Sequence, residues 1–235
     1  MMLGARTEAW AKRGGGVPTA RDYVQDGLIA MWDGIENAGW GKHSEQASCI
    51  DLTGTNESIK NYFSQEVDSF WLQGNTIPVR IGNQLLSAIA SATFTFESYL
   101  DISTFSRWNY VISAKYSSDW LKFSMRYNIS TSILSSQKIM NANLNSISEG
   151  KNRISFTSEL GGNGVIYENE KTKTFQAMTE TEQISDQTLY FGSLKNYGMY
   201  GCNCKVHCVR FYERTLTADE IAANYAIDKA RFNQT

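Results

Sequence analysis

Short segments in which apolar and polar residues alternate recur along the chain, and they predict strands. Thr93-Phe-Thr-Phe-Glu97 has the period of two that is typical of a strand with one buried face. Similar segments, rich in β-branched and aromatic residues, are separated by Gly, Asn, Ser and Asp. They are 28–32, 69–72, 76–81, 93–100, 110–116, 120–127, 153–158, 164–167, 188–192 and 205–212. About ten strands at this spacing, with only two prolines, favour an all-β sandwich or barrel.

The end of the chain changes from a strand pattern to a helix pattern. Thr217-Ala-Asp-Glu220 is a capping box, in which the side chains of Thr217 and Glu220 can each accept a hydrogen bond from the other residue's amide. Ile221, Tyr225 and Phe232 follow on one apolar stripe. The pattern therefore predicts a short C-terminal helix that docks on the sheets.

Composition and charge narrow the class of partner. Apolar residues make up 42% of the chain and aromatic residues 12%, as in ordinary globular proteins. The formal net charge is −2 and the basic residues do not cluster, so we expect no nucleic acid partner. No apolar run approaches the roughly 20 residues of a membrane helix, so we expect no membrane insertion.

We predict two parts of the chain, an N-terminal segment over 1–21 and a single domain over 22–235. Within the first part, residues 3–13 can form a short helix, and Gly14-Gly15-Gly16 would end it and act as a flexible joint. The segment lacks the apolar stretch of a signal peptide. Either the protein is not exported by the usual route, or the sequence is a trimmed form.

Three of the four cysteines fall within one predicted strand that includes and extends the segment 205–212. Strand geometry places Cys202, Cys204 and Cys208 on one face and His207 on the opposite face. Cys202 and Cys204 would then lie about 6.6 Å apart, which is awkward for a disulfide. The spacing C-x-C-x3-C is not a usual zinc pattern. We therefore interpret these residues and Cys49 as buried free thiols.

The segment 209–225, VRFYERTLTADEIAANY, resembles the closing signature of a known family, the laminin-G-like jelly-roll domains of the concanavalin A-like lectin/glucanase superfamily. The matching positions are Arg210, Tyr212, Arg214, Leu216, Thr217, Glu220 and Asn224. Segments 26–33, 51–54 and 189–192 also resemble stretches of the family, in the same order. Cys49 stands where the family has Trp, and Glu170 replaces the glycine of a Tyr-x-Asn-Gly hairpin. The resemblance covers roughly residues 22–232 and implies a jelly-roll β-sandwich of two antiparallel sheets.

Many members of this family bind carbohydrate or act in adhesion, so the resemblance implies a glycan or surface polysaccharide as partner. Sugar recognition needs exposed aromatic rings with short polar side chains around them. One candidate loop carries Trp40 between two glycines, with Asn37 and His43 nearby, and a second carries Tyr197 and Tyr200. The alternative is that these rings only fix their own loops to the body. We interpret Trp32, Trp71 and Trp120, which lie in strand patterns, as core residues.

Calcium is common among relatives, and the resemblance makes it a possible cofactor here. Calcium takes six to eight oxygen ligands. Asp33, Glu36 and Asp51 lie in predicted loops that could converge, but separate acidic residues on loops are usually only solvated.

The resemblance also raises the question of an enzyme, because glucanases share this fold. Those enzymes carry a Glu-x-Asp-x-(x)-Glu run on one strand, and the nearest match is Glu66-Val-Asp68, which lacks the third acid. We therefore predict no enzyme activity, and keep a glycoside hydrolase as an alternative. A further alternative is a structural component of a phage particle or surface assembly, with protein partners. The family resemblance suggests an extracellular or virion-associated location.

Overall fold

A computed structural model describes most of the chain. The described residues are 16–37, 48–60, 68–73, 77–103, 109–115, 121–127, 132–135, 148–176, 187–192 and 202–233. The helix predicted for residues 3–13 lies outside this set, and the division of the chain after residue 21 stays a prediction.

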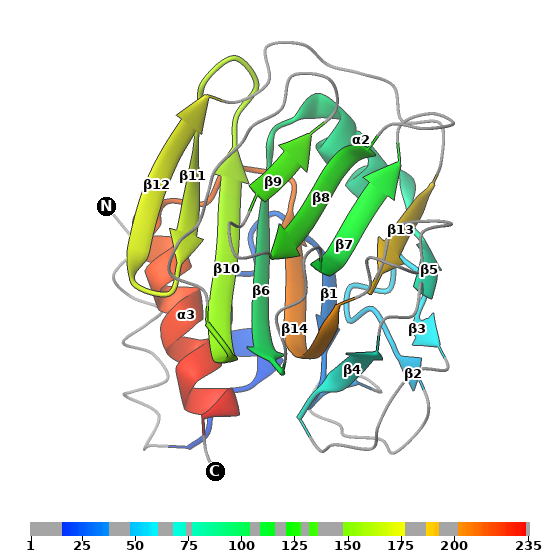
Figure 1. The fold of residues 1–235 in the computed structure, drawn as a ribbon, viewed down its shortest axis with the longest axis vertical. Coiled ribbons are helices and arrows are strands. Elements are labelled where there is room, and N and C mark those ends of the chain that lie inside the picture. The colour runs from blue at the N-terminus through cyan, green and yellow to red at the C-terminus, as the bar shows by residue number, and fades with distance from the viewer. Residues whose placement is uncertain are drawn as a thin grey trace.

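Two antiparallel sheets form the body of the described structure (Figure 1). The larger sheet contains, in spatial order, β1 (Leu28–Asp33), β14 (Asn203–Tyr212), β6 (Phe94–Ile102), β10 (Gly150–Ser158), β11 (Asn163–Glu168) and β12 (Lys171–Gln176), with β4 (Phe70–Gln73) also paired to β14. The smaller sheet contains β5 (Ile77–Arg80), β13 (Thr188–Phe191), β7 (Asn109–Lys115), β8 (Leu121–Tyr127) and β9 (Ser132–Ser135). Two short strands, β2 (Ser48–Cys49) and β3 (Ile59–Lys60), pair with each other.

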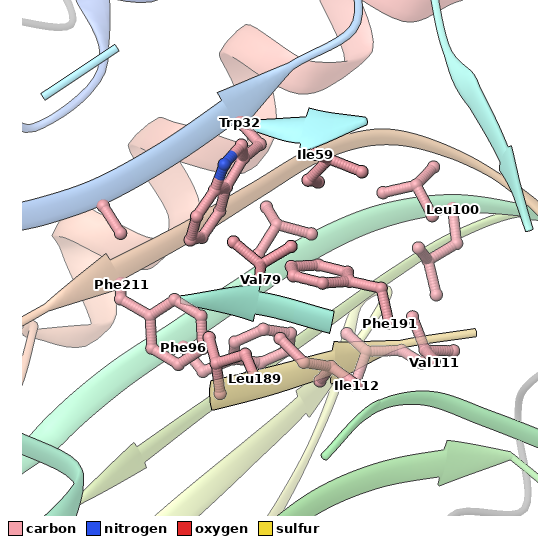
Figure 2. Close-up of a cluster of buried hydrophobic side chains, with 14 of the residues drawn as sticks. Trp32, Ile59, Val79, Phe96, Leu100, Val111, Ile112, Leu189, Phe191 and Phe211 are labelled. Carbon is pink, nitrogen blue, oxygen red and sulfur yellow. The ribbon is translucent and has the colours of Figure 1, made fainter. Parts of the chain in front are cut away.

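The main hydrophobic core fills the space between the two sheets. Figure 2 shows part of this core, where side chains from β1, β6 and β14 meet side chains from β5, β7 and β13. Trp32 is fully buried there, as predicted, and its ring meets the edge of Phe191 with 5.5 Å between ring centroids. The predicted all-β sandwich of two antiparallel sheets is therefore confirmed.

Among the described residues, three helical segments accompany the sheets: the 3-10 turn η1 (Ala20–Asp22), α2 (Asn83–Ser91) and α3 (Ala218–Phe232). The predicted capping box of α3 is present, because the Thr217 side chain accepts from the Glu220 amide and the Glu220 side chain accepts from the Thr217 amide. α3 packs on the outer face of the larger sheet, where Ile221 and Phe232 are buried. Among the described residues, no helix is long and apolar enough to span a membrane.

Each of the ten predicted strands is present, within a few residues at each end. The prediction omitted β2, β3, β9 and β12, which are short or polar, and also omitted α2. The signal for α2 was the spacing of Leu85, Ala88 and Ile89, which are its buried residues. The β11–β12 hairpin forms although Glu170 stands in the place of a glycine. In its turn Asn169 has a positive φ of 51° and Glu170 does not, and asparagine adopts this conformation more readily than most residues.

The predicted arrangement of the cysteines on β14 is wrong in one respect. A bulge between Val206 and Cys208 inserts an extra residue opposite β6, so that the side-chain alternation reverses there. Cys202 and Cys204 point into the core between the sheets, whereas Cys208 lies on the α3 side. His207 lies on the α3 side too, with its ring 5.0 Å from that of Phe232. All four cysteines are buried free thiols.

Candidate functional site

The two loops singled out in the sequence leave the body from neighbouring strand ends. β1 runs antiparallel to β14, toward the start of β14. β13 ends beside that same start, because the Cys202 amide donates to the Gly192 carbonyl at 2.8 Å. The contact between Trp32 of β1 and Phe191 of β13 joins the two strand ends across the core. The segments that follow β1 and β13 therefore start at the same end of the sandwich.

Of the predicted ligand-binding residues, Asn37 is the one that the structure describes. Asn37 is partly buried, and its carbonyl accepts from the Ile50 amide at 2.9 Å. This bond ties the beginning of the first loop to the chain that returns from it. The other four predicted residues, Trp40, His43, Tyr197 and Tyr200, lie outside the described residues, so their place in a binding site stays a prediction.

A glycine fixes the start of the first loop. A Cβ on Gly34 would lie 2.4 Å from the Asp68 carbonyl oxygen, so the two backbone segments touch at a distance that only glycine permits. The Gly34 amide donates to the His207 carbonyl at 2.8 Å. The first candidate loop thus begins against the chain that leads into β4.

A second group of polar side chains is far more completely defined, and it lies between the larger sheet and α3. We call it the α3 network; it consists of Tyr23, Asp33, Glu36, Glu97, Arg210, Asn224, Asp228 and Arg231, each 5% exposed or less. The residues come from the segment that precedes β1, from β1 and the loop that follows it, and from β6, β14 and α3.

Arg210 is the centre of one half of the α3 network. Its Nη1 and Nη2 donate to the two carboxylate oxygens of Asp228, both at 2.8 Å, and its Nε donates to Glu97 at 3.0 Å. The Tyr23 hydroxyl donates to Asp228 at 2.7 Å, and the Asn224 amide donates to Glu97 at 2.7 Å. The guanidinium carbon lies 4.0 Å from the centre of the Tyr23 ring. Arg210 is therefore fully buried, and its charge is compensated by two carboxylates and by the face of an aromatic ring.

Arg231 is the centre of the other half. Its Nη1 and Nη2 donate to the Asp33 carboxylate at 2.6 and 2.9 Å, and Nη2 also donates to Glu36 at 3.1 Å. Nη1 donates to the Tyr23 hydroxyl at 3.1 Å, so Tyr23 links the two halves. Glu36 also accepts from the Ala20 amide at 2.6 Å, which fastens the N-terminal segment to the same group.

The pKa values of the two carboxyl groups that bind Arg210, those of Asp228 and Glu97, are shifted in opposite directions. Burial tends to raise the pKa of Asp228, but the bidentate Arg210 contact and the bonds from Tyr23 and Cys208 hold the pKa of that carboxyl below its usual range. Burial raises the pKa of Glu97, which receives fewer hydrogen bonds. Its Oε1 has no hydrogen-bond partner among the described residues.

The α3 network is an architectural feature rather than an open site. Its side chains are buried and satisfied almost entirely by one another, so a ligand would have to displace α3 to reach them. The predicted docking stripe of the helix, Ile221, Tyr225 and Phe232, does not include these polar residues. The available signal was the family signature, which already contained Arg210 and Asn224.

The three carboxylates considered for calcium do not fit that ion. Asp33 and Glu36 face the positive charge of Arg231, which would repel a cation. Asp51 is surrounded by N–H and O–H donors of its own loop, including the Asn56 amide at 2.9 Å and the Thr53 hydroxyl at 2.6 Å. It also accepts from the Met31 amide at 2.8 Å. Asp51 therefore shapes its turn, and the three acids do not converge.

Comparisons with known proteins support the fold. No family model and no curated protein matches the sequence. Among solved structures, the chain is similar to Trypanosoma rangeli sialidase in complex with sialic acid, with a TM-score of 0.61 and 13% identity over 93% of this chain and 35% of the sialidase chain. It is also similar to the binding domain of botulinum neurotoxin serotype C1, with a TM-score of 0.61 and 15% identity over 88% of this chain and 52% of that chain. At these identities the likeness concerns the fold.

These similarities overturn the prediction that the chain is not an enzyme. The prediction was based on the missing carboxylate run of the glucanases, but the similar structures include sialidases, which are enzymes without being glucanases. The missing run therefore does not exclude catalysis. The chain spans about a third of the length of these sialidases, 35% in the case of the sialic acid complex.

Proposed function

We propose that this protein binds glycans through the two loops that leave the ends of β1 and β13. The observation that carries the proposal is the adjacency of those strand ends, which the Trp32–Phe191 contact and the bond between Cys202 and Gly192 establish. Both loops contain aromatic residues between glycines, and they start from one end of the sandwich. Together they can supply one surface.

The side chains that we assign to this surface have complementary tasks. Trp40, Tyr197 and Tyr200 would present ring faces to the apolar side of a sugar ring, and Asn37 and His43 would bond its hydroxyls. Sialic acid is the first sugar to test, because one similar structure is a sialidase in complex with it. We also propose that the chain belongs to the concanavalin A-like, laminin-G-like domains. The position of the signature residues Arg210 and Asn224 at the centre of the α3 network supports this assignment.

A glycan array that pairs sialylated glycans with their desialylated forms tests the proposal. We expect specific binding that weakens about tenfold, or roughly 1.4 kcal/mol, in Trp40→Ala and Tyr197→Ala. Leu160→Ala is the matched control, because Leu160 is exposed in the β10–β11 turn. This turn lies next to the start of β6, at the end of the larger sheet opposite to the two candidate loops. Unchanged affinity in both loop variants, from folded protein, would place the binding surface elsewhere. A blank array would favour a role in assembly through protein partners.

Glycoside hydrolysis is a second candidate, favoured by the sialidases among the similar structures. The test is release of free sialic acid from a fluorogenic α-sialoside, followed against protein concentration. Release proportional to protein would support the hydrolase. Binding on the array without any release would leave the glycan-binding function alone.

A further inference from the structure

Two of the four cysteines are in direct contact at the start of β14. The Cys204 thiol donates to the Cys202 sulfur across 3.3 Å, and both side chains are fully buried in the core between the sheets. The other two thiols have different partners. The Cys49 thiol donates to the Asp33 carbonyl at 3.4 Å, and the Cys208 thiol donates to Asp228 at 3.4 Å. The contact between two sulfurs therefore sets the first pair apart.

We propose that Cys202 and Cys204 are a reversible redox pair, which a low-molecular-weight disulfide such as oxidised glutathione converts into a C-x-C disulfide. In the first exchange the Cys202 thiolate attacks one glutathione sulfur, and one glutathione thiolate leaves. The Cys204 thiolate then attacks the Cys202 sulfur of the mixed disulfide and expels the second glutathione. The protein loses two protons and two electrons, and oxidised glutathione is reduced to two molecules of glutathione.

The backbone around the pair decides which sulfur moves. Cys204 lies within β14 between two partner strands, opposite Leu72 of β4 and Ile102 of β6. Cys202 precedes β14, and its amide bonds Gly192 rather than a strand of the larger sheet. Closing the bond requires the sulfurs to approach from 3.3 Å to about 2.05 Å. The segment at Cys202 is the one with the freedom to supply that movement.

Strand geometry makes the disulfide reversible. Residues two apart on an extended strand have Cα atoms about 6.6 Å apart, near the upper end of the usual range of roughly 4.4–6.8 Å for disulfides. A disulfide held at that limit is strained, and strained disulfides are the readily reduced ones. The same geometry that made this disulfide awkward as a permanent link therefore suits a bond that forms and breaks with the redox poise.

Burial slows the reaction. It raises the pKa of the Cys202 thiol, so exchange proceeds through local opening of the chain at this strand end. Once formed, the bond would fasten residue 202 to β14 at the base of the connection between β13 and β14.

Equilibration of the full chain in a series of glutathione redox buffers tests the proposal. Each sample is quenched with acid and denatured, its remaining thiols are alkylated, and the products are identified by mass spectrometry. The number of alkylated thiols should fall from four to two as the buffer becomes oxidising. The peptide that contains Cys202 and Cys204 should lack two hydrogens, and dithiothreitol should restore all the thiols. Peptide mapping of the unmodified sequence gives this result without any variant.

Single variants supply matched controls. Cys49→Ala and Cys208→Ala should still lose two thiols, whereas Cys202→Ala and Cys204→Ala should form no disulfide within the chain. Four alkylated thiols in every buffer would overturn the proposal. So would a glutathione adduct that never resolves, or a bond that joins any other pair.

Discussion

Replacing Arg210 by Met tests whether the α3 network holds the helix on the sheet. The change removes the two bonds to Asp228, both of 2.8 Å, and the bond of 3.0 Å to Glu97, while the methionine chain fills much of the same space. It leaves two buried carboxylates without their shared cation. Removing one partner of a buried ion pair costs about 3–5 kcal/mol. Because whole proteins are stable by only about 5–15 kcal/mol, this loss is large.

The measurement is urea unfolding followed by circular dichroism, with the free energy of unfolding taken from linear extrapolation. We expect Arg210→Met to lose about 3–5 kcal/mol at neutral pH. The double variant Arg210→Met/Asp228→Leu should be more stable than Arg210→Met, because it removes one of the two unpaired carboxylates. The double variant also controls for the lost packing of the arginine stem.

The pH dependence supplies a second readout. In the natural sequence the pKa of Asp228 is depressed, so its contribution to stability is present above the unfolded pKa of about 3.9 and is lost as pH falls. In Arg210→Met the buried carboxyls lose their cation, so their pKa values rise and stability is lost as pH rises. The difference between the two proteins should therefore grow from about pH 4 to about pH 7. A loss below about 1 kcal/mol at neutral pH, with an unchanged denaturant slope, would refute this account of helix docking.

Three further predictions use the same unfolding assay. Burial lowers the pKa of His207 below 6.5, so the unfolded chain binds a proton at this residue at a higher pH than the folded chain does. Stability should therefore fall as pH drops below about 6.5. His207→Gln should flatten this part of the pH profile of stability, and an unaltered profile would contradict the prediction. Glu220→Ala removes half of the capping box of α3 and should cost about 1 kcal/mol in the free energy of unfolding. A cost that largely disappears at high salt would instead assign the effect to the ion pair with Arg214. Gly34→Ala forces a Cβ onto the Asp68 carbonyl and should cost about 1–3 kcal/mol, whereas Gly16→Ala, which has open space, should cost little; equal effects would contradict the packing argument.

The sequence by itself determined the sandwich and its C-terminal helix. Alternation such as Thr93-Phe-Thr-Phe-Glu97 fixes which side chains face the core, because the side-chain period of a strand is two. The capping box at Thr217 marks the start of α3 within a few residues, since its hydrogen bonds join neighbours in the chain. These signals are local, and local signals can be read without knowing the fold.

Only the tertiary structure decided the parts that depend on distant residues. The bulge before Cys208 reverses the alternation of β14 because of its pairing with β6, so the faces of His207 and Cys208 could not be assigned from spacing. The partners of Arg210 lie 113 and 18 residues away in the chain, at Glu97 and Asp228. The burial of such a charge is stable only when those partners meet it, and their meeting is a property of the packed sheets and helix rather than of any one segment.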